Sequence, residues 1–211
     1  MISLHNYGTG VPGDSTGIGF GAGASFGYTK GSIGFERSGS YGTGDLVFLT
    51  NNDQDSTMVN STDVRMRITR QGYVTKPTHP SFHIGSPYDS GQSSGQVWRS
   101  HSNAIYSNVG SHYNNSNGRF TAPVDGQYFF FHWGMSNSSG QTNDVYSRKN
   151  GSRDQIGTSY NQSSGAGHNQ YSCSYVRTLS AGDYVDLYVS NGNNYATTDG
   201  RHGGWGGWLI G

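Results

Sequence analysis

The stretch GQYFFFHWGM, residues 126–135, places aromatic residues at almost every position. Successive side chains of a strand point to opposite faces. Two rows should therefore face opposite ways: Tyr128, Phe130 and His132 on one side, and Phe129, Phe131 and Trp133 on the other. A β-sandwich buries only one face of each sheet within a subunit. We therefore expect the second aromatic row to contact another surface, most simply another subunit.

The rest of the chain also has the pattern of an all-β protein. Short alternating runs bounded by Gly, Asn, Asp and Ser recur, and long helix-period patterns are absent. Asn150-Gly151 predicts a two-residue hairpin, because both residues tolerate the positive φ of a type I′ turn. After residue 76 the expected strands lie in HPSFHIG, AIYSNVG, GRFTAPV, GQYFFFHWGM, DVYSRKNG, QYSCSYVRTL, DYVDLYVS and GWGGWLIG, about the number that a two-sheet jelly roll needs.

The first third of the chain is a separate, glycine-rich β region. GIGFG at 17–21 is echoed by SIGFE at 32–36, which aligns Ile18 with Ile33, and residues 45–50 and 64–69 are further candidate strands. KPTHP at 76–80 interrupts this pattern because proline donates no backbone hydrogen bond. We expect two domains, residues 1–76 and residues 77–211.

Composition excludes several classes of partner. The 13 basic and 13 acidic residues cancel, and the cations are scattered, so nucleic acid is not an expected partner. A basic start with an apolar core is absent, as is a run of about 18 apolar residues, so we expect neither a signal peptide nor membrane insertion. The single cysteine, Cys173, alternates with Tyr171 and Tyr175 and is expected to be a small buried hydrophobe.

Catalytic and metal-binding patterns are weak. GTGVPG at 8–13 matches G-x-G-x-x-G without the strand and helix that a dinucleotide site needs, and Asp14 stands where a phosphate loop has lysine. The acidic residues form no pair of the kind that a polysaccharide depolymerase uses. We therefore expect a protein without enzymatic activity, catalytic residues, cofactor or dedicated metal site.

Five segments resemble the C1q-like domain of the tumour necrosis factor-like superfamily: PSFHIG (80–85), NVGSHYNNSNGRFTAPVDGQYFFF (108–131), RKNG (148–151), TLSAGDYVDLYV (178–189) and WGGWLIG (205–211). The resemblance implies a jelly-roll β-sandwich that assembles as a homotrimer around inner-sheet aromatics. It allows calcium near the trimer axis, held by copies of Asp183 or Asp199. By this analogy the residues of the core or trimer interface are Tyr128, Phe130, Trp133, Trp205, Gly206, Gly207 and Trp208.

The glycines of the last expected strand predict a particular place for it in the trimer. Glycine within a strand often marks close backbone approach. We expect Gly206 and Gly207 to lie near the threefold axis, where valine at position 207 should weaken trimerisation more than valine at Gly165 in a predicted loop.

The N-terminal region resembles a different group of proteins. GSIGFERSGSYGTGDLVFLTNND (31–53), followed by VRMRITRQGYV (64–74), is similar to segments of bacteriophage tail-fibre and other virion proteins. The resemblance implies a virion protein, assembled in the host cytoplasm, whose N-terminal region contacts other virion proteins. The expected function is a trimeric fibre or adhesin with a C1q-like head for host-surface recognition. The alternatives are a capsid decoration protein (cement or head-fibre) with a purely structural role, and a free-standing C1q-like glycan-binding protein.

Three polar loops could form the recognition surface of the head. They span residues 136–144, 159–170 and 190–204 and offer amides, hydroxyls and tyrosines, which suit neutral glycans. The alternative is that these loops are only solvated connections of the sandwich. The candidate ligand-contact residues are Tyr160, Asn161, Asn194 and Tyr195.

Overall fold

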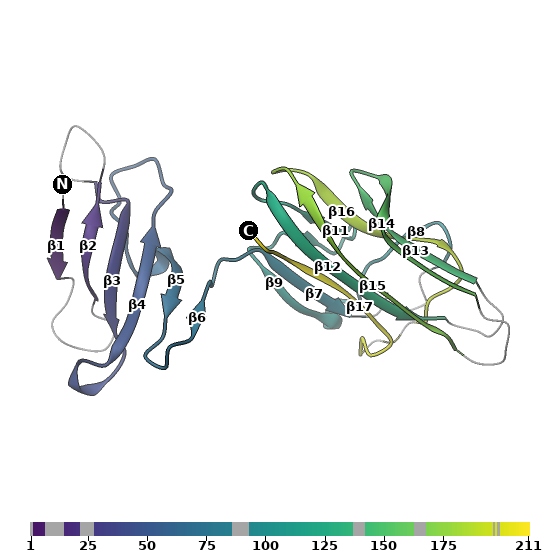
Figure 1. The fold of residues 1–211 in the computed structure, drawn as a ribbon, viewed down its shortest axis with the longest axis horizontal. Coiled ribbons are helices and arrows are strands. Elements are labelled where there is room, and N and C mark those ends of the chain that lie inside the picture. Colours follow the sequence, from purple (N-terminus) through teal and green to yellow (C-terminus); the bar gives the residue numbers. More distant parts are fainter. Residues whose placement is uncertain are drawn as a thin grey trace. The chain divides into compact units, whose positions relative to one another are not determined.

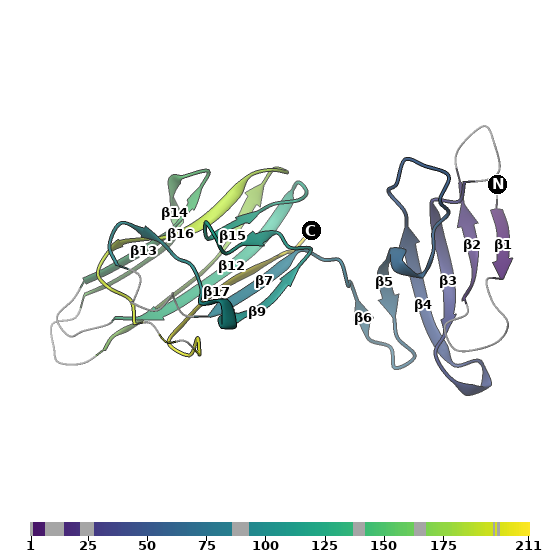
Figure 2. The same cartoon turned by 180° about the vertical axis from the view of Figure 1, so that it is seen from behind.

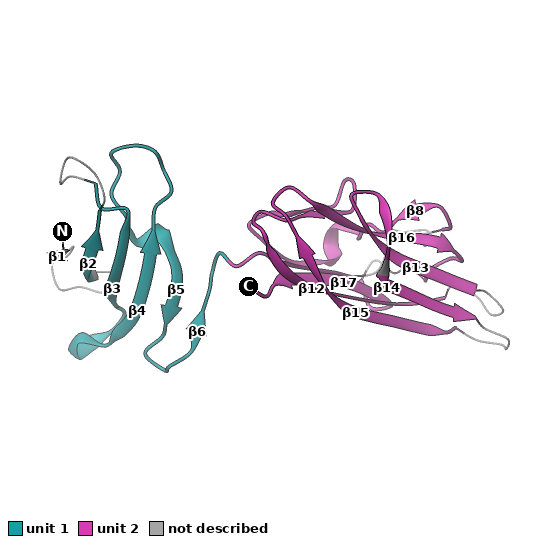
Figure 3. Cartoon of the chain, turned by 45° about the horizontal axis from the view of Figure 1, so that its top comes forward, with its two compact units in different colours: residues 1–78 teal, residues 79–211 magenta. Residues whose placement is uncertain are grey.

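The computed structural model describes residues 2–6, 15–21, 28–85, 93–136, 142–162, 168–195, 197 and 199–211. In these ranges the regular structure consists of strands and three short 3-10 turns, so the all-β prediction is confirmed. The described part contains no helix long and apolar enough to cross a membrane. The chain divides into unit 1, Met1–Thr78, and unit 2, His79–Gly211 (Figure 3), two residues beyond the expected boundary.

Unit 1 is an antiparallel sheet whose strands lie side by side in chain order (Figures 1 and 2). Ile18 lies opposite Ile33, so the two similar runs in the sequence are neighbouring strands. The strands are β1 (Ile2–Asn6), β2 (Ser15–Phe20), β3 (Gly31–Arg37), β4 (Gly44–Thr50), β5 (Val64–Ile68) and β6 (Val74–Thr75).

One face of this sheet is covered by residues 51–63, which connect β4 to β5. The amide of Val59 donates to the carbonyl of Thr29, 2.8 Å away, and so ties the connection to the sheet. The buried apolar residues beneath it are few: Val47, Leu49, Val59 and Val64. Such a small core buries little apolar surface for the length of chain that it must order.

Unit 2 is a sandwich of two antiparallel sheets (Figure 1). The first sheet has the order β15-β12-β17-β7-β9, and the second has the order β10-β11-β16-β13-β14 with β8 paired to β16. The strands are β7 (Ser81–Gly85), β8 (Gln96–Val97), β9 (Ile105–Val109), β10 (Tyr113–Asn114), β11 (Arg119–Thr121), β12 (Gly126–Met135), β13 (Thr142–Lys149), β14 (Ser152–Gln162), β15 (Gln170–Leu179), β16 (Tyr184–Asn191) and β17 (Gly203–Leu209).

The core of unit 2 is aromatic. The ring of Phe82 stacks on Tyr113 with centroids 5.1 Å apart, and Trp205 meets Phe82 edge-on at 4.8 Å. Interlocked rings of this kind bury a large apolar area from few residues, which suits a chain with only 31% hydrophobic residues. Strand β12 contributes its buried row to this core: Tyr128, Phe130 and His132.

The hairpin between β13 and β14 agrees with one local prediction and differs from another. Asn150 and Gly151 join β13 to β14 with φ of 51° and 82°, as the type I′ hairpin requires. Strand β14 continues to Gln162, however, so the predicted loop 159–170 is wrong for its first four residues. Pairing with β13 extends this polar segment as a strand, in the register Tyr160 to Asp144.

The outer face of the second sheet carries charged side chains that form ion pairs within the chain. Asp186 is fully buried and accepts two hydrogen bonds from Arg148, at 2.6 and 3.0 Å. Three arginines lie over tyrosine rings, 4.0–4.2 Å from the ring centroids, in the pairs Arg119–Tyr184, Arg148–Tyr188 and Arg153–Tyr146. We call this surface the arginine–tyrosine face.

Candidate functional site: the outer aromatic face of unit 2

The second aromatic row of β12 points away from the core of unit 2, as the alternation predicted. Phe129, Phe131 and Trp133 are half-buried, whereas their neighbours in the strand are buried. Trp208 of β17 lies beside this row, with its ring 4.5 Å from Phe129, and is 43% exposed. These rings, with His83 and Tyr106, form a continuous surface that we call the outer aromatic face.

His83 and Tyr106 extend this face onto β7 and β9. The His83 ring lies 5.6 Å from Phe131 and 4.9 Å from Tyr106. Burial lowers the pKa of His83, so the imidazole is neutral among these rings at neutral pH. The sequence did not identify these two residues, although the alternation in SFHIG places His83 opposite the buried Phe82.

The glycines of β17 make room for the rings of this face. A Cβ on Gly206 would come within 2.7 Å of the Phe131 ring, and one on Gly204 within 2.6 Å of the Trp133 indole nitrogen. Gly207 faces the opposite way, where a Cβ would be 2.5 Å from the Phe130 ring in the core. The two glycines singled out in the sequence thus accommodate aromatic rings of their own subunit. Their expected place near a threefold axis stays a prediction. The comparison position, Gly165, lies outside the described residues.

The other residues expected in the core or interface fall on both sides of the sheet. Tyr128, Phe130 and Trp205 are fully buried in the core of a single subunit. Trp133 and Trp208 belong to the outer aromatic face. The half-buried Cys173 packs against the core, and burial raises the pKa of its thiol, which does not favour a reactive thiolate.

The candidate ligand-contact residues separate into exposed and buried positions. Tyr160 is 66% exposed, and Asn161 donates to the carbonyl of Gln170 at 2.6 Å. Tyr195 lies edge-on between the rings of His168 and His202, with centroids 5.0 and 4.7 Å away.

Asn194 does not lie on an exposed surface, contrary to the prediction. It is fully buried, and its side-chain oxygen accepts a hydrogen bond from the hydroxyl of Tyr171. Asn194 also forms an isolated bridge with Ser136. This residue therefore holds the end of the sandwich together and does not face a ligand.

The two carboxylates considered for calcium are engaged by basic groups of their own subunit. Asp183 lies 2.6 Å from the ammonium of Lys149, and its pKa is lowered first by the hydrogen bond from Lys149. Asp199 is paired with Arg201, which likewise lowers its pKa. The described residues contain no cluster of three or more His, Cys, Asp or Glu side chains that could hold a metal. Calcium at the axis of an assembly stays a prediction.

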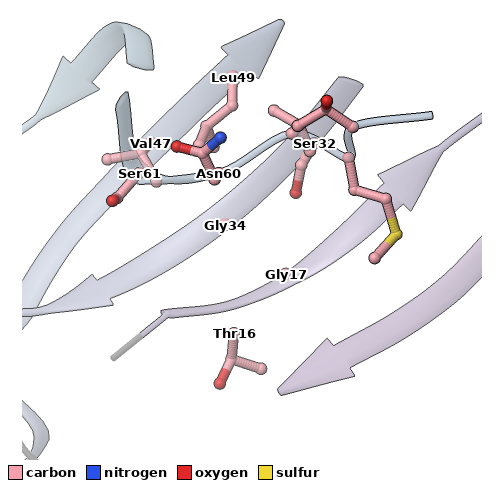
Figure 4. A pocket seen from close by; sticks show the side chains of 11 residues that line it. Thr16, Gly17, Ser32, Gly34, Val47, Leu49, Asn60 and Ser61 are labelled. Atoms are coloured by element: carbon pink, nitrogen blue, oxygen red, sulfur yellow. The ribbon is translucent and has the colours of Figure 1, made fainter. Parts of the chain in front are cut away.

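Unit 1 contains a separate cavity of about 450 Å³ between its sheet and residues 57–61 (Figure 4). Gly17 and Gly34 line the cavity on the side of the sheet, and its other walls include Ser32, Leu49 and Asn60. Hydroxyl, amide and apolar groups are mixed there, and none of the lining residues is ionisable. This cavity therefore offers no acid, base or charged ligand group.

Comparisons with known proteins agree with this architecture. Residues 91–210 match the model of the C1q family, described as the C1q domain. Among solved structures, the globular domain of zebrafish complement 1qA protein is 19% identical, with 63% of this chain and 98% of that chain covered and a TM-score of 0.48. Eiger TNF from S. frugiperda is 13% identical, with 64% of this chain and 94% of that chain covered and a TM-score of 0.51. Murine APRIL at pH 5.0 is 13% identical, with 63% and 99% covered and a TM-score of 0.48.

The likeness to Eiger TNF, with a TM-score above 0.5, concerns the fold alone, and no curated protein matches the chain. C1q- and TNF-like domains commonly form homotrimers and bind ligands, and they are typically non-enzymatic. The family model spans more than half of the chain. The protein therefore belongs to the C1q domain family.

Proposed function

We propose that the protein is a homotrimeric, non-enzymatic bacteriophage virion protein, a fibre or adhesin whose unit 2 contacts the host surface. The observation that carries the assembly is the outer aromatic face. Phe129, Phe131 and Trp208 present rings on the side of the sheet that the subunit's own core does not use. Exposed aromatic clusters of this kind mark interaction surfaces.

The two outer faces of unit 2 differ in a way that supports this assembly. Four of the five strands of the first sheet, β7, β9, β12 and β17, contain no Asp, Glu, Lys or Arg. The fifth strand, β15, contains Arg177, which is ion-paired with Asp154 of the same chain. The arginine–tyrosine face on the opposite sheet carries charged side chains that are ion-paired within the chain, and it suits contact with water. An interface depleted of charge and rich in aromatic residues is typical of the centre of a protein contact. The first sheet thus faces the neighbouring subunits.

The virion assignment rests on the N-terminal segments that resemble tail-fibre proteins, residues 31–53 and 64–74. Both belong to unit 1, which is a compact body distinct from the C1q-like unit. In this proposal unit 1 connects the head to other virion proteins in particles assembled in the host cytoplasm. The same arrangement would serve a capsid decoration protein, which differs in making no specific host contact.

The recognition surface is the end of unit 2 that carries Tyr160 and Tyr195. Both tyrosines lie near hydrogen-bonding groups: Asn161 follows Tyr160, and His168 contacts Tyr195. Phenol rings with neighbouring amides and imidazoles suit neutral sugars, through stacking and hydrogen bonds. Binding through three such ends would be multivalent.

Sedimentation of the full chain tests the assembly. We expect three copies in the wild type and dissociation in Trp208→Glu, because a carboxylate would be buried among aromatic rings. Tyr160→Glu, at a more exposed position, is the matched control and should stay trimeric. A wild-type monomer at micromolar concentration would refute the trimer.

Binding to host envelopes tests recognition. We expect binding that changes little between low and high salt, since few ion pairs are available to be screened. It should fall in Tyr160→Ala and Tyr195→Ala but not in Tyr73→Ala, an exposed tyrosine of unit 1. Absence of binding, with the chain found in purified particles by mass spectrometry, would favour the decoration role. Absence of the chain from particles would favour the free-standing protein.

A further inference from the structure

Unit 1 exposes an apolar surface on the face of its sheet opposite residues 51–63. Cross-strand pairing aligns Ile18 with Ile33, Ile33 with Phe48, and Phe48 with Met66 in one row. A second row aligns Phe35, Leu46 and Ile68, and continues to Val74. We call the following residues the apolar sheet face: Ile18, Phe20, Ile33, Phe35, Leu46, Phe48, Met66, Ile68 and Val74.

One group of charges in this sheet lies on the side opposite these rows. Arg67 forms ion pairs with Glu36 and Asp45, and all three alternate with the apolar sheet face, so they lie on the opposite side. The positions that would face solvent in a monomer therefore carry isoleucine, phenylalanine and leucine. Positions on the covered side include Gly17, Gly34 and Ser32. Arg37, at the end of β3, lies on the same side as Phe35, and its Nε donates to the carbonyl of Gly39, 3.0 Å away. The two rows themselves carry no ionic group, and such rows are complemented by an equally apolar surface rather than by nucleic acid or a charged protein.

The size of this surface limits what it can do alone. Six of its members are exposed, from 37% for Ile18 to 57% for Val74. With about 150–250 Å² for a fully exposed large side chain, they leave roughly 400 Å² of apolar area per chain. A stable interface buries about 800 Å² per partner. The apolar sheet face is therefore too small to hold two free copies together, but it is large enough to add to an assembly held elsewhere.

We propose that the apolar sheet faces of three chains pack against one another, so that unit 1 forms a three-sheet stalk with an apolar interior. This inference rests on the proposed trimer of unit 2. The tether that joins the units is short, because β6 ends at Thr75 and unit 2 begins at His79. Three residues span at most about 11 Å.

A tether of this length gives the three copies of unit 1 a high effective concentration once the heads are trimeric. Short linkers produce values in the millimolar range. Copies of one chain are also the partner that is certain to carry a matching apolar surface of the same extent. The stalk further explains why the buried core of a single unit 1 is so small, since most of its large apolar side chains lie on the other face.

Thiol accessibility in the full-length chain tests this contact. In a Cys173→Ser background, Ile33→Cys places a thiol in the apolar sheet face, and Leu46→Cys gives a second position on the next strand. Gln54→Cys, in the exposed connection on the opposite side, is the matched control. A charged maleimide should label Ile33→Cys and Leu46→Cys about tenfold more slowly in native protein than in urea, since only opening of the assembly exposes them. Gln54→Cys should react equally fast in both.

A short bismaleimide identifies what covers the face. We expect covalent dimers and trimers from Ile33→Cys and Leu46→Cys but not from Gln54→Cys. Sedimentation of the same samples separates the two proposals. A trimer whose position-33 and position-46 thiols react like the control overturns the stalk and leaves the proposed function standing. Slow labelling of these thiols without cross-links between chains also overturns the stalk, because the apolar sheet face is then covered by something other than a second copy of the chain. A monomer overturns both proposals.

Discussion

Acidification should destabilise unit 2 because His132 is enclosed in its core. The side chain is 1% exposed, and its Nε2 lies 2.7 Å from the hydroxyl of Ser159. Burial lowers the pKa of His132 from 6.5 to about 3. Between these two values the unfolded chain binds a proton at this residue and the folded chain does not. The free energy of unfolding must therefore fall as the pH falls below 6.5.

The size of this effect follows from the pKa difference. The unfolded chain is half protonated at this site at pH 6.5 and nearly fully protonated at pH 4.5, so lowering the pH between these values should cost about 2 kcal/mol at this site. His83 and His112 have pKa values lowered by burial and add to the loss with the same sign. Asp183 and Asp199 have lowered pKa values, so their contribution is lost below about pH 4, outside this window.

Urea unfolding followed by tryptophan fluorescence measures this loss in the full chain. All four tryptophans belong to unit 2, so the signal does not report unit 1: Trp98, Trp133, Trp205 and Trp208. Protein concentration must be fixed, because assembly shifts the midpoint. The double variant His132→Phe, Ser159→Ala removes the titrating group without leaving a lone hydroxyl. It should lose about 2 kcal/mol less than wild type between pH 6.5 and 4.5. Equal pH dependence of the two proteins would refute the reasoning.

Three substitutions probe other features of unit 2, each by urea unfolding. Gly207→Val should lower the free energy of unfolding by about 3 kcal/mol, because valine overpacks the core. Gly211→Val is the control and should lower it little, because a Cβ there meets no atom within 4 Å. Equal losses in the two variants would contradict the packing explanation. Asp186→Asn should cost about 3–5 kcal/mol, because Arg148 loses its buried partner, and a loss below about 1 kcal/mol would show that this pair is not stabilising. Gly151→Ala should cost about 1–2 kcal/mol, since φ of 82° disfavours a side chain, and an unchanged midpoint would contradict this strain.

The features that sequence predicted well are those set by local patterns. The alternation in GQYFFFHWGM separates buried from outward-facing residues of β12 because a strand has a fixed period of two. The Asn150-Gly151 turn followed from backbone preferences of two adjacent residues. The C1q-like segments then placed these strands in a jelly roll, a step that depended on resemblance and not on local physics.

The features that sequence missed depend on partners distant in the chain. Asn194 lies in a polar run that is typical of a solvated loop. It is nevertheless buried, and its side-chain oxygen accepts a hydrogen bond from Tyr171, 23 residues away. The glycines of β17 accommodate rings on β12, which no local pattern reveals. The apolar sheet face has a local signal, because Ile33 and Phe35 alternate with Ser32 and Gly34, but the signal is weak in a region with so many glycine and polar residues.

The position of β17 has a consequence for biosynthesis. This strand lies between β12 and β7 in the first sheet, and it pairs with β7 through partners such as Gly85 and Gly204. About 120 residues separate them, and translation takes roughly 6–24 s to cover that distance. Until β17 emerges from the ribosome, β7 and β12 lack the strand that joins them, so the outer aromatic face does not exist as a continuous surface. Nascent chains on one messenger therefore cannot associate prematurely through it.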